Sequence, residues 1–155
     1  MESNSSSTDQ AFLEELRRRR AELRESMSAL EDALAAPATA DEARWAQRVH
    51  VALVEFSGDF REHVDITEGP NGLYRDLLRT SPRLSGAVAS LTREHELISG
   101  QVDSLVTRVE APEVIEDVDG IRGLGTTLLG RLVRHRQRGA DLVFDAYAFD
   151  IGGET

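Results

Sequence analysis

The sequence predicts an all-α protein that folds as an up-down-up-down four-helix bundle. Three observations lead to this prediction. Apolar residues recur at intervals of three and four along four segments, which is the pattern of helices with one buried face. No segment alternates apolar and polar residues as a half-buried strand does. The connections are short, so consecutive helices are expected to lie antiparallel and to cover one another's apolar stripes.

The first helix is expected to follow a polar tail. Residues 1–6 are small and polar, so we expect them to be disordered. Ser7 and Gln10 have the spacing of a capping box, which places the start of the helix at residue 7. The helix should end before Pro37, because proline cannot continue it. Its apolar stripe consists of Leu13, Leu16, Leu23, Met27, Leu30 and Leu34.

A second capping box, Thr39 to Glu42, opens a helix that is expected to extend to about Thr67. Its apolar stripe consists of Trp45, Val49, Ala52, Phe56 and Phe60. The glycines, proline and asparagine of residues 68–72 then predict a turn. Residues 73–79 are apolar enough for a short helical connection.

Ser81 followed by Pro82 predicts the start of the third helix, because proline is favoured at the first helical position. Residues 110–119 are acidic and contain a proline, which predicts a loop, and Asp119 is expected to cap the fourth helix. The stripes of the two helices consist of Leu84, Val88, Leu91, Ile98, Val102, Leu105 and Val109, and of Ile121, Leu124, Leu128, Leu132 and Leu142. The bundle is therefore expected to span residues 7–151, with a C-terminal tail at 152–155.

Composition excludes several kinds of chemistry. The 155 residues include 28 acidic and 18 basic side chains, and the net charge of −10 argues against nucleic-acid or anionic-membrane partners. All 18 basic residues are arginines and there is no cysteine, so lysine Schiff bases, disulfides and thiolate ligands are excluded. No apolar run has the length of a membrane span or of a signal core. We therefore expect a cytoplasmic protein.

Three histidines continue the apolar stripes of three different helices. His63, His95 and His135 each occupy a stripe position, so their imidazoles are expected to point toward the bundle axis. A single inward histidine is more often a core residue with a protein partner. Three unpaired imidazoles would cost several kcal/mol to bury, whereas a shared metal ion would satisfy all of them. His50 lies beside its stripe and is expected to be a flanking residue.

Two carboxylates follow these histidines at a longer spacing than one helical turn. Glu68 comes five residues after His63 and Asp141 six residues after His135, which rotates them by about 140° and 240° around an ideal helix. A glycine close to each carboxylate would allow local unwinding that brings it inward. Without such unwinding, Glu68 and Asp141 are expected to be solvated charges.

Other charged residues have alternative interpretations. Asp59, four residues before His63, is the other candidate ligand on the second helix, whereas Glu94 and Glu96 are expected to face away from the axis. Arg20 occupies a stripe position of the first helix. We expect its guanidinium either to lie near the bundle interior or to reach water while its stem packs.

These features resemble the hemerythrin (HHE cation-binding) family, in an actinobacterial branch. The resemblance is carried by the inward His63 with Glu68 after it, by His95 within Arg-Glu-His-Glu, and by His135 with Asp141 after it. It implies a non-haem di-iron centre within a four-helix bundle, with these five residues as the metal ligands. The histidine that the family usually carries on the first helix is absent here. Three imidazoles and two carboxylates provide ligands for one firmly held ion, or for two with open positions.

Three functions follow as alternatives. The first is a metal-binding protein, with iron or alternatively manganese or zinc, that binds, senses or detoxifies dioxygen, peroxide or a related small molecule. The second is a di-iron or mono-iron oxidase or peroxidase acting on an organic substrate, in which Tyr74 and Tyr147 either take part in the chemistry or only pack. The third is a metal-free adaptor, whose run Arg17–Arg20 either contacts an acidic partner or is a solvated, glutamate-paired stretch.

Overall fold

The computed structural model describes residues 2–111 and 117–153, with side chains described from 10 to 146 within those ranges. The described residues form helices and no strand, which confirms the predicted all-α class. The elements are α1 (Glu2–Ala35), α2 (Glu42–Glu68), α3 (Leu73–Thr80), the 3-10 turn η1 (Pro82–Leu84), α4 (Ser85–Glu110) and α5 (Val118–Gly153).

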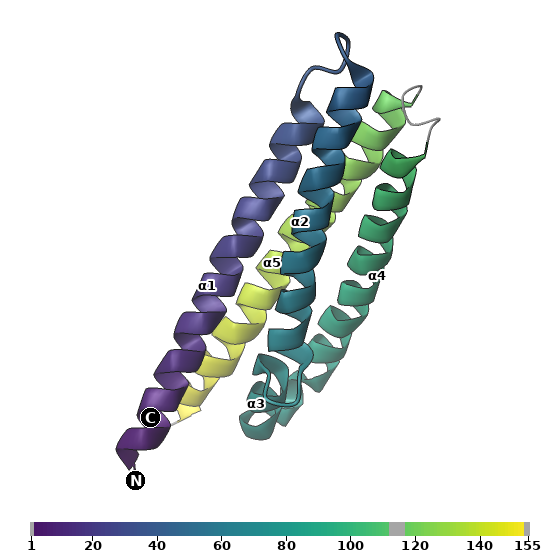
Figure 1. Cartoon of the computed structure of the whole chain (residues 1–155). Coiled ribbons are helices and arrows are strands. Elements are labelled where there is room, and N and C mark those ends of the chain that lie inside the picture. Colours follow the sequence, from purple (N-terminus) through teal and green to yellow (C-terminus); the bar gives the residue numbers. More distant parts are fainter. Residues whose placement is uncertain (1, 112–116, 154–155) are drawn as a thin grey trace.

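Four long helices run up and down, and the short α3 lies at the end where α2 connects to α4 (Figure 1). Each long helix packs against the next in a ring: α1 on α2, α2 on α4, α4 on α5, and α5 on α1. Both chain termini lie at the end that carries α3 (Figure 1). None of the described helices combines the length and the hydropathy that a membrane span requires.

The outer ends of two helices differ from the predictions. Helix α1 begins at Glu2, so residues 2–6, for which composition predicts a disordered tail, continue the helix, and the expected start at Ser7 lies inside it. Helix α5 extends to Gly153 instead of ending before Gly152. Each residue added to an existing helix gains a hydrogen bond without the cost of nucleation, so weak helix formers at an end do not stop it.

The starts of α2 and α4 also differ in detail. The N-cap of α2 is Asp41, whose Oδ1 accepts the backbone N–H of Arg44 at 3.0 Å, and not Thr39. Ser81 and Pro82 begin the 3-10 turn η1, and α4 itself starts at Ser85. The short helix expected after the turn at 68–72 is α3.

The core has two parts, and the three stripe histidines lie between them. The larger part fills the bundle at the α1–α2 connection and includes the fully buried Phe56. The smaller part packs α3 against the other end and includes Tyr74. Along α4, Leu91 belongs to the smaller part and Ile98 to the larger, with His95 between them. The polar layer is therefore covered by apolar side chains on both sides.

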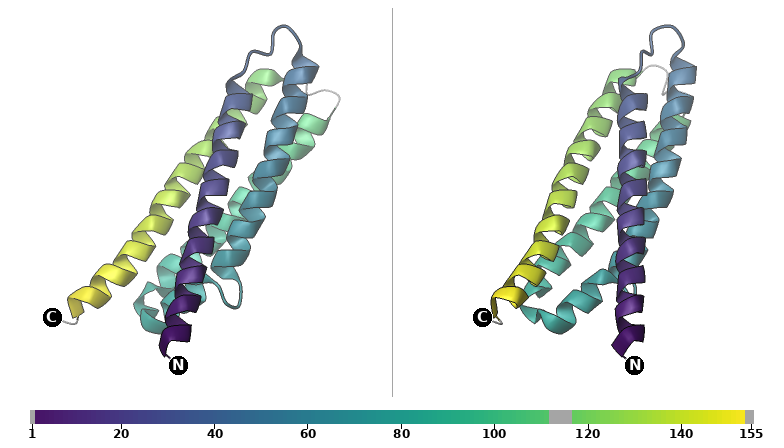
Figure 2. Two further views of the ribbon diagram at one scale, coloured as in Figure 1. Left: turned by 60° about the vertical axis from the view of Figure 1, so that its left-hand side comes forward. Right: turned by 90° about the vertical axis from the view of Figure 1, so that its left-hand side faces the viewer.

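Helices α1 and α5 meet at one end and diverge toward the termini, as both views of Figure 2 show. At the closed end, Arg122 of α5 donates to the backbone carbonyl oxygens of Leu34 at 2.9 Å and Ala36 at 2.8 Å. It thereby satisfies carbonyls that the end of α1 leaves free. A Cβ on Gly125 would lie 2.5 Å from Cδ1 of Leu34, so a glycine suits this close approach. Leu13 and Leu124, although on predicted stripes, are 40% and 44% exposed.

The stability of the bundle should depend on the larger part of the core. Phe56→Ala should lower the free energy of unfolding by about 3–5 kcal/mol, because it removes a fully buried ring and leaves a cavity. Phe144→Ala is the matched control, since Phe144 is 70% exposed, and it should change the same quantity by less than about 0.5 kcal/mol. Urea denaturation followed by circular dichroism measures both. Equal effects would contradict this assignment of the core.

Candidate metal centre

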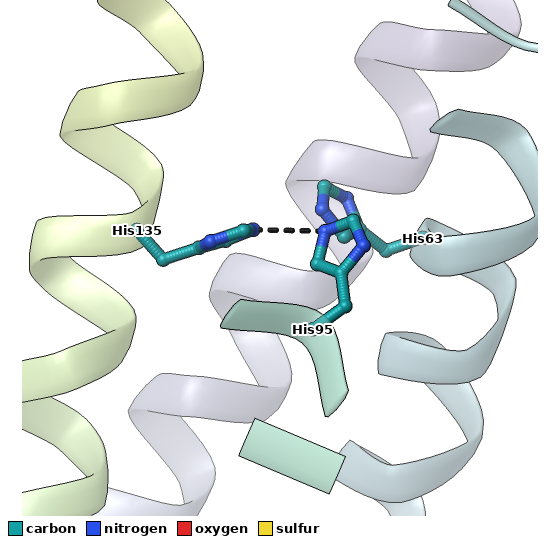
Figure 3. A group of neighbouring side chains, drawn as sticks. All are labelled: His63, His95 and His135. Atoms are coloured by element: carbon teal, nitrogen blue, oxygen red, sulfur yellow. Dashed lines mark hydrogen bonds between the residues drawn. The ribbon is translucent and has the colours of Figure 1, made fainter. Parts of the chain in front are cut away.

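Three imidazoles meet inside the bundle. His63 of α2, His95 of α4 and His135 of α5 point toward one another (Figure 3), and one ring nitrogen of each lies within 4.8 Å of those of the other two. His95 is 2% exposed and His135 5% exposed. The predicted convergence of the three stripe histidines is therefore confirmed.

His50 lies elsewhere, also as predicted. Its Nε2 is 2.7 Å from Oε1 of Glu110, at the far end of α4. Helix α1 contributes no imidazole, because its sequence contains no histidine. The three-histidine group is thus open on the side that α1 faces.

Two carboxylates contact the outer nitrogens of the histidines. Nδ1 of His95 lies 2.7 Å from Oε2 of Glu68. Nδ1 of His135 lies 3.3 Å from Oε1 of Glu94, but the two atoms form no hydrogen bond. The other oxygen of Glu94 accepts a hydrogen bond from Arg138 at 2.5 Å. Because an ionised carboxylate only accepts, the Glu68 contact favours a proton on Nδ1 of His95 and leaves a lone pair on its Nε2.

The inner nitrogens of His95 and His135 lie close together. Nε2 of His95 and Nε2 of His135 lie 3.0 Å apart, so two lone pairs face each other when both outer nitrogens are protonated. Two neutral imidazoles carry two N–H groups, which suffice for the Glu68 contact and for the contact between the rings, and Nδ1 of His135 and Oε1 of Glu94 are then left without a hydrogen bond. Nε2 of His63 is buried and has no hydrogen-bond partner. A cation among these nitrogens would satisfy all of them.

A third proton is disfavoured at this position. Burial, and then the neighbouring imidazoles, lower the pKa of His63 to about 3. Burial and His135 likewise lower the pKa of His95 to about 3. Burial also lowers the pKa of His135, although Glu94 opposes the shift. The three rings are therefore neutral near pH 7, which is the form in which imidazole binds metal ions.

Two aromatic rings hold the imidazoles in place. Phe60 stacks on His63 with ring centres 5.7 Å apart and also meets His95 and His135 edge-on. Tyr74 of α3 stacks on His95 at 5.9 Å with an angle of 11° between the planes. Burial raises the pKa of Tyr74, which keeps its phenol protonated. The side chain of Tyr147 lies outside the described residues.

The structure does not bring every expected carboxylate to the histidines. Asp141 is exposed on α5 and accepts a hydrogen bond from Gln137 at 3.0 Å. Helix α5 stays regular through Gly139, so no unwinding offsets the rotation between His135 and Asp141. Asp59 accepts a hydrogen bond from Ser26 of α1 and is not part of the histidine group. Glu68 lies at the outer nitrogen of His95 rather than among the inner nitrogens.

Glu94 corrects the prediction that it faces away from the axis. It is only 6% exposed, and it lies between His135 and Arg138 of α5. Position 94 is three residues after Leu91 and four before Ile98, so it fits the stripe spacing as well as position 95 does. This spacing was the signal in the sequence that Glu94 could also face inward. Glu96 is exposed, as predicted.

A cavity of about 440 Å³ opens beside the imidazoles, between α1 and α5. His63 and His135 line it, together with Thr67, Tyr74 and side chains of both helices. Arg20 also lines it, and desolvation lowers the pKa of its guanidinium. The residue is nevertheless exposed, which favours the expectation that its guanidinium reaches water. Arg20 forms no ion pair within the described part of the chain.

Comparison with protein-family models, with curated proteins and with solved structures finds no match for this chain.

The buried imidazoles should make stability depend on pH. Their folded-state pKa values lie below the unfolded value, so the stability that requires neutral rings is present above about pH 6.5 and is lost as the pH falls toward 3. Between about pH 7.5 and pH 5, metal-free protein should lose about 1–2 kcal/mol more than a His63→Leu variant does. Urea denaturation of both proteins at the two pH values measures the difference. Parallel losses would show that His63 is protonated without penalty in the folded protein.

Proposed function

We propose that this chain binds one transition-metal ion through His63, His95 and His135. Unsatisfied ring nitrogens support the proposal most strongly: Nε2 of His63 and Nδ1 of His135 have no hydrogen-bond partner, Nε2 of His95 lies 3.0 Å from Nε2 of His135, and a carboxylate lies beside the outer nitrogen of His95 and of His135. Metal-bound histidines in proteins typically donate their other ring N–H to a carboxylate or carbonyl in this way. Glu68 and Glu94 fit that orienting role.

A single ion agrees better with the ligands than a di-iron centre does. A pair of ions needs bridging carboxylates, but Glu68 and Glu94 contact outer nitrogens, and Asp141 is exposed. Three imidazoles leave coordination positions of an ion open for a small molecule. The cavity adjoins His63 and His135, so it provides access to those positions.

The proposed ion is iron, and its proposed ligand is dioxygen, peroxide or a related species. This assignment comes from the resemblance to hemerythrins, which the inward histidines on three helices of a four-helix bundle support. Imidazole ligands also suit zinc, and manganese is the other alternative. The protein would then bind, sense or detoxify an oxygen species.

An oxidase or peroxidase is the second candidate function. The cavity of about 440 Å³ favours it, because it is larger than a diatomic ligand needs and places an organic molecule beside the imidazoles. Tyr74 lines the same cavity and stacks on His95. A metal-free adaptor is less favoured, because it would leave Nε2 of His63 buried without a partner.

Metal binding should require all three inward histidines. His63→Ala, His95→Ala and His135→Ala should each reduce the bound metal sharply, because each removes one of three ligands. His50→Ala is the control, since His50 pairs with Glu110 away from the group, and it should retain full occupancy. Elemental analysis of untagged protein grown with added iron measures the stoichiometry, and circular dichroism checks the fold. Full occupancy in the His95→Ala variant would rule out the proposed site.

The outer carboxylates should tune the affinity without being ligands. Glu94→Gln and Glu68→Gln should weaken metal binding by about 10–100-fold, because each weakens the contact that orients an imidazole. Asp141→Asn, an equivalent loss of charge on α5, should leave the affinity unchanged. Competition with a chromophoric chelator measures the dissociation constants. An Asp141→Asn effect as large as that of Glu94→Gln would return Asp141 to the ligand set.

A further inference from the structure

The cavity between α1 and α5 has an unusual charge for this protein. Arg20 and Arg24 of α1 and Arg136 of α5 line it, and no aspartate or glutamate is among its described lining residues. The chain as a whole carries a net charge of −10. A cavity with three arginines and no carboxylate is therefore the reverse of the overall charge balance.

These arginines also lack carboxylate partners among the described residues. None of the three forms an ion pair or hydrogen bond with the described side chains, whereas Arg18, Arg19, Arg79, Arg108 and Arg138 all pair with carboxylates. Arg20 and Arg24 are four residues apart, so they share one face of α1. Arg136 stands on α5 across the cavity. Guanidinium groups on both walls are thus available to a ligand.

A second cavity of the protein has both positive and negative side chains in its lining. A space of about 890 Å³ between α1 and α2 is lined by Arg44 and Arg48, but also by Asp32, Asp41 and Glu55. Its positive and negative side chains offset one another. The cavity beside the histidines therefore stands apart by its charge.

The remaining walls are largely apolar. Leu23 and Met27 of α1, Leu73 of α3 and Leu132 of α5 face the cavity. Cavities of this volume, with apolar walls and a few convergent polar groups, are typical of small-molecule sites. The apolar side chains suit a hydrocarbon body, and the guanidinium groups suit a carboxylate or phosphate head.

We propose that the cavity binds an organic anion that has an apolar body and a single anionic head. The guanidinium groups of Arg20, Arg24 and Arg136 pair with the head, and the leucines and methionine contact the body. His63 and His135 line the same cavity, so the bound anion lies beside the candidate metal centre. The binding itself rests on the arginines and the apolar walls, and it needs no metal.

Calorimetric titration of the full chain tests the proposal, with octanoate as the probe and 1-octanol and inorganic phosphate as comparisons. The protein is used as purified and after treatment with chelator, so that failure of the anion site is distinguished from failure of the metal site. Octanoate should bind one per chain in both forms. Octanol and phosphate should each bind at least about tenfold more weakly, because octanol lacks the anionic head and phosphate lacks the apolar body.

Paired variants locate the site. Arg20→Gln with Arg24→Gln should weaken octanoate binding by about tenfold or more, and Arg136→Gln alone should weaken it in the same direction. Arg44→Gln with Arg48→Gln removes the same charge at the same spacing on α2 and should have no effect. If both double variants weakened octanoate binding equally, the effect would come from the net charge of the protein and not from the cavity. Octanol or phosphate binding as tightly as octanoate, or no octanoate binding in either form, would overturn the proposal.

Discussion

The placement of three neutral imidazoles, two buried and one half-buried, between two apolar clusters is the constraint on which the centre of this bundle depends. His95 and His135 approach within 3.0 Å through inner nitrogens, while carboxylates face their outer nitrogens. When two neutral rings supply protons to Glu68 and to the contact between the rings, Nδ1 of His135 and Oε1 of Glu94 are left without a hydrogen bond. Burial opposes a third proton, and it leaves Nε2 of His63 without a partner. A cation bound among the inner nitrogens would satisfy them, and apolar side chains cover the histidine layer on both sides along the bundle.

The surrounding elements pack against the layer of histidines. Helix α3 places Tyr74 flat against His95 and closes one end of the bundle, and Phe60 of α2 packs against all three rings. Glu94 is buried between His135 and Arg138, so its charge is balanced beside the imidazole. The bundle thus fixes the direction of the inner nitrogens through aromatic packing and through ionic contacts between α4 and α5.

Helix α1 carries no histidine, and the cavity lies on that side of the histidine group. Arg122 and Gly125 hold α1 and α5 together at one end, and the helices then separate, so a cavity opens where α1 supplies no imidazole. Its arginines give this opening a positive charge in an acidic protein. The candidate metal centre and the proposed anion cavity therefore share one boundary, formed by His63 and His135.

Local patterns in the sequence determined the helices and the inward direction of His63, His95 and His135, because apolar periodicity is a property of one helix at a time. The tertiary structure decided which carboxylates meet them. Glu94 fits the stripe as well as its neighbour does, and only the packing of α5 against α4 made it a partner of His135. Asp141 stayed exposed because α5 remained regular. The cavity likewise depends on how α1 and α5, which are distant in the sequence, diverge. The residue spacing within either helix does not determine that angle.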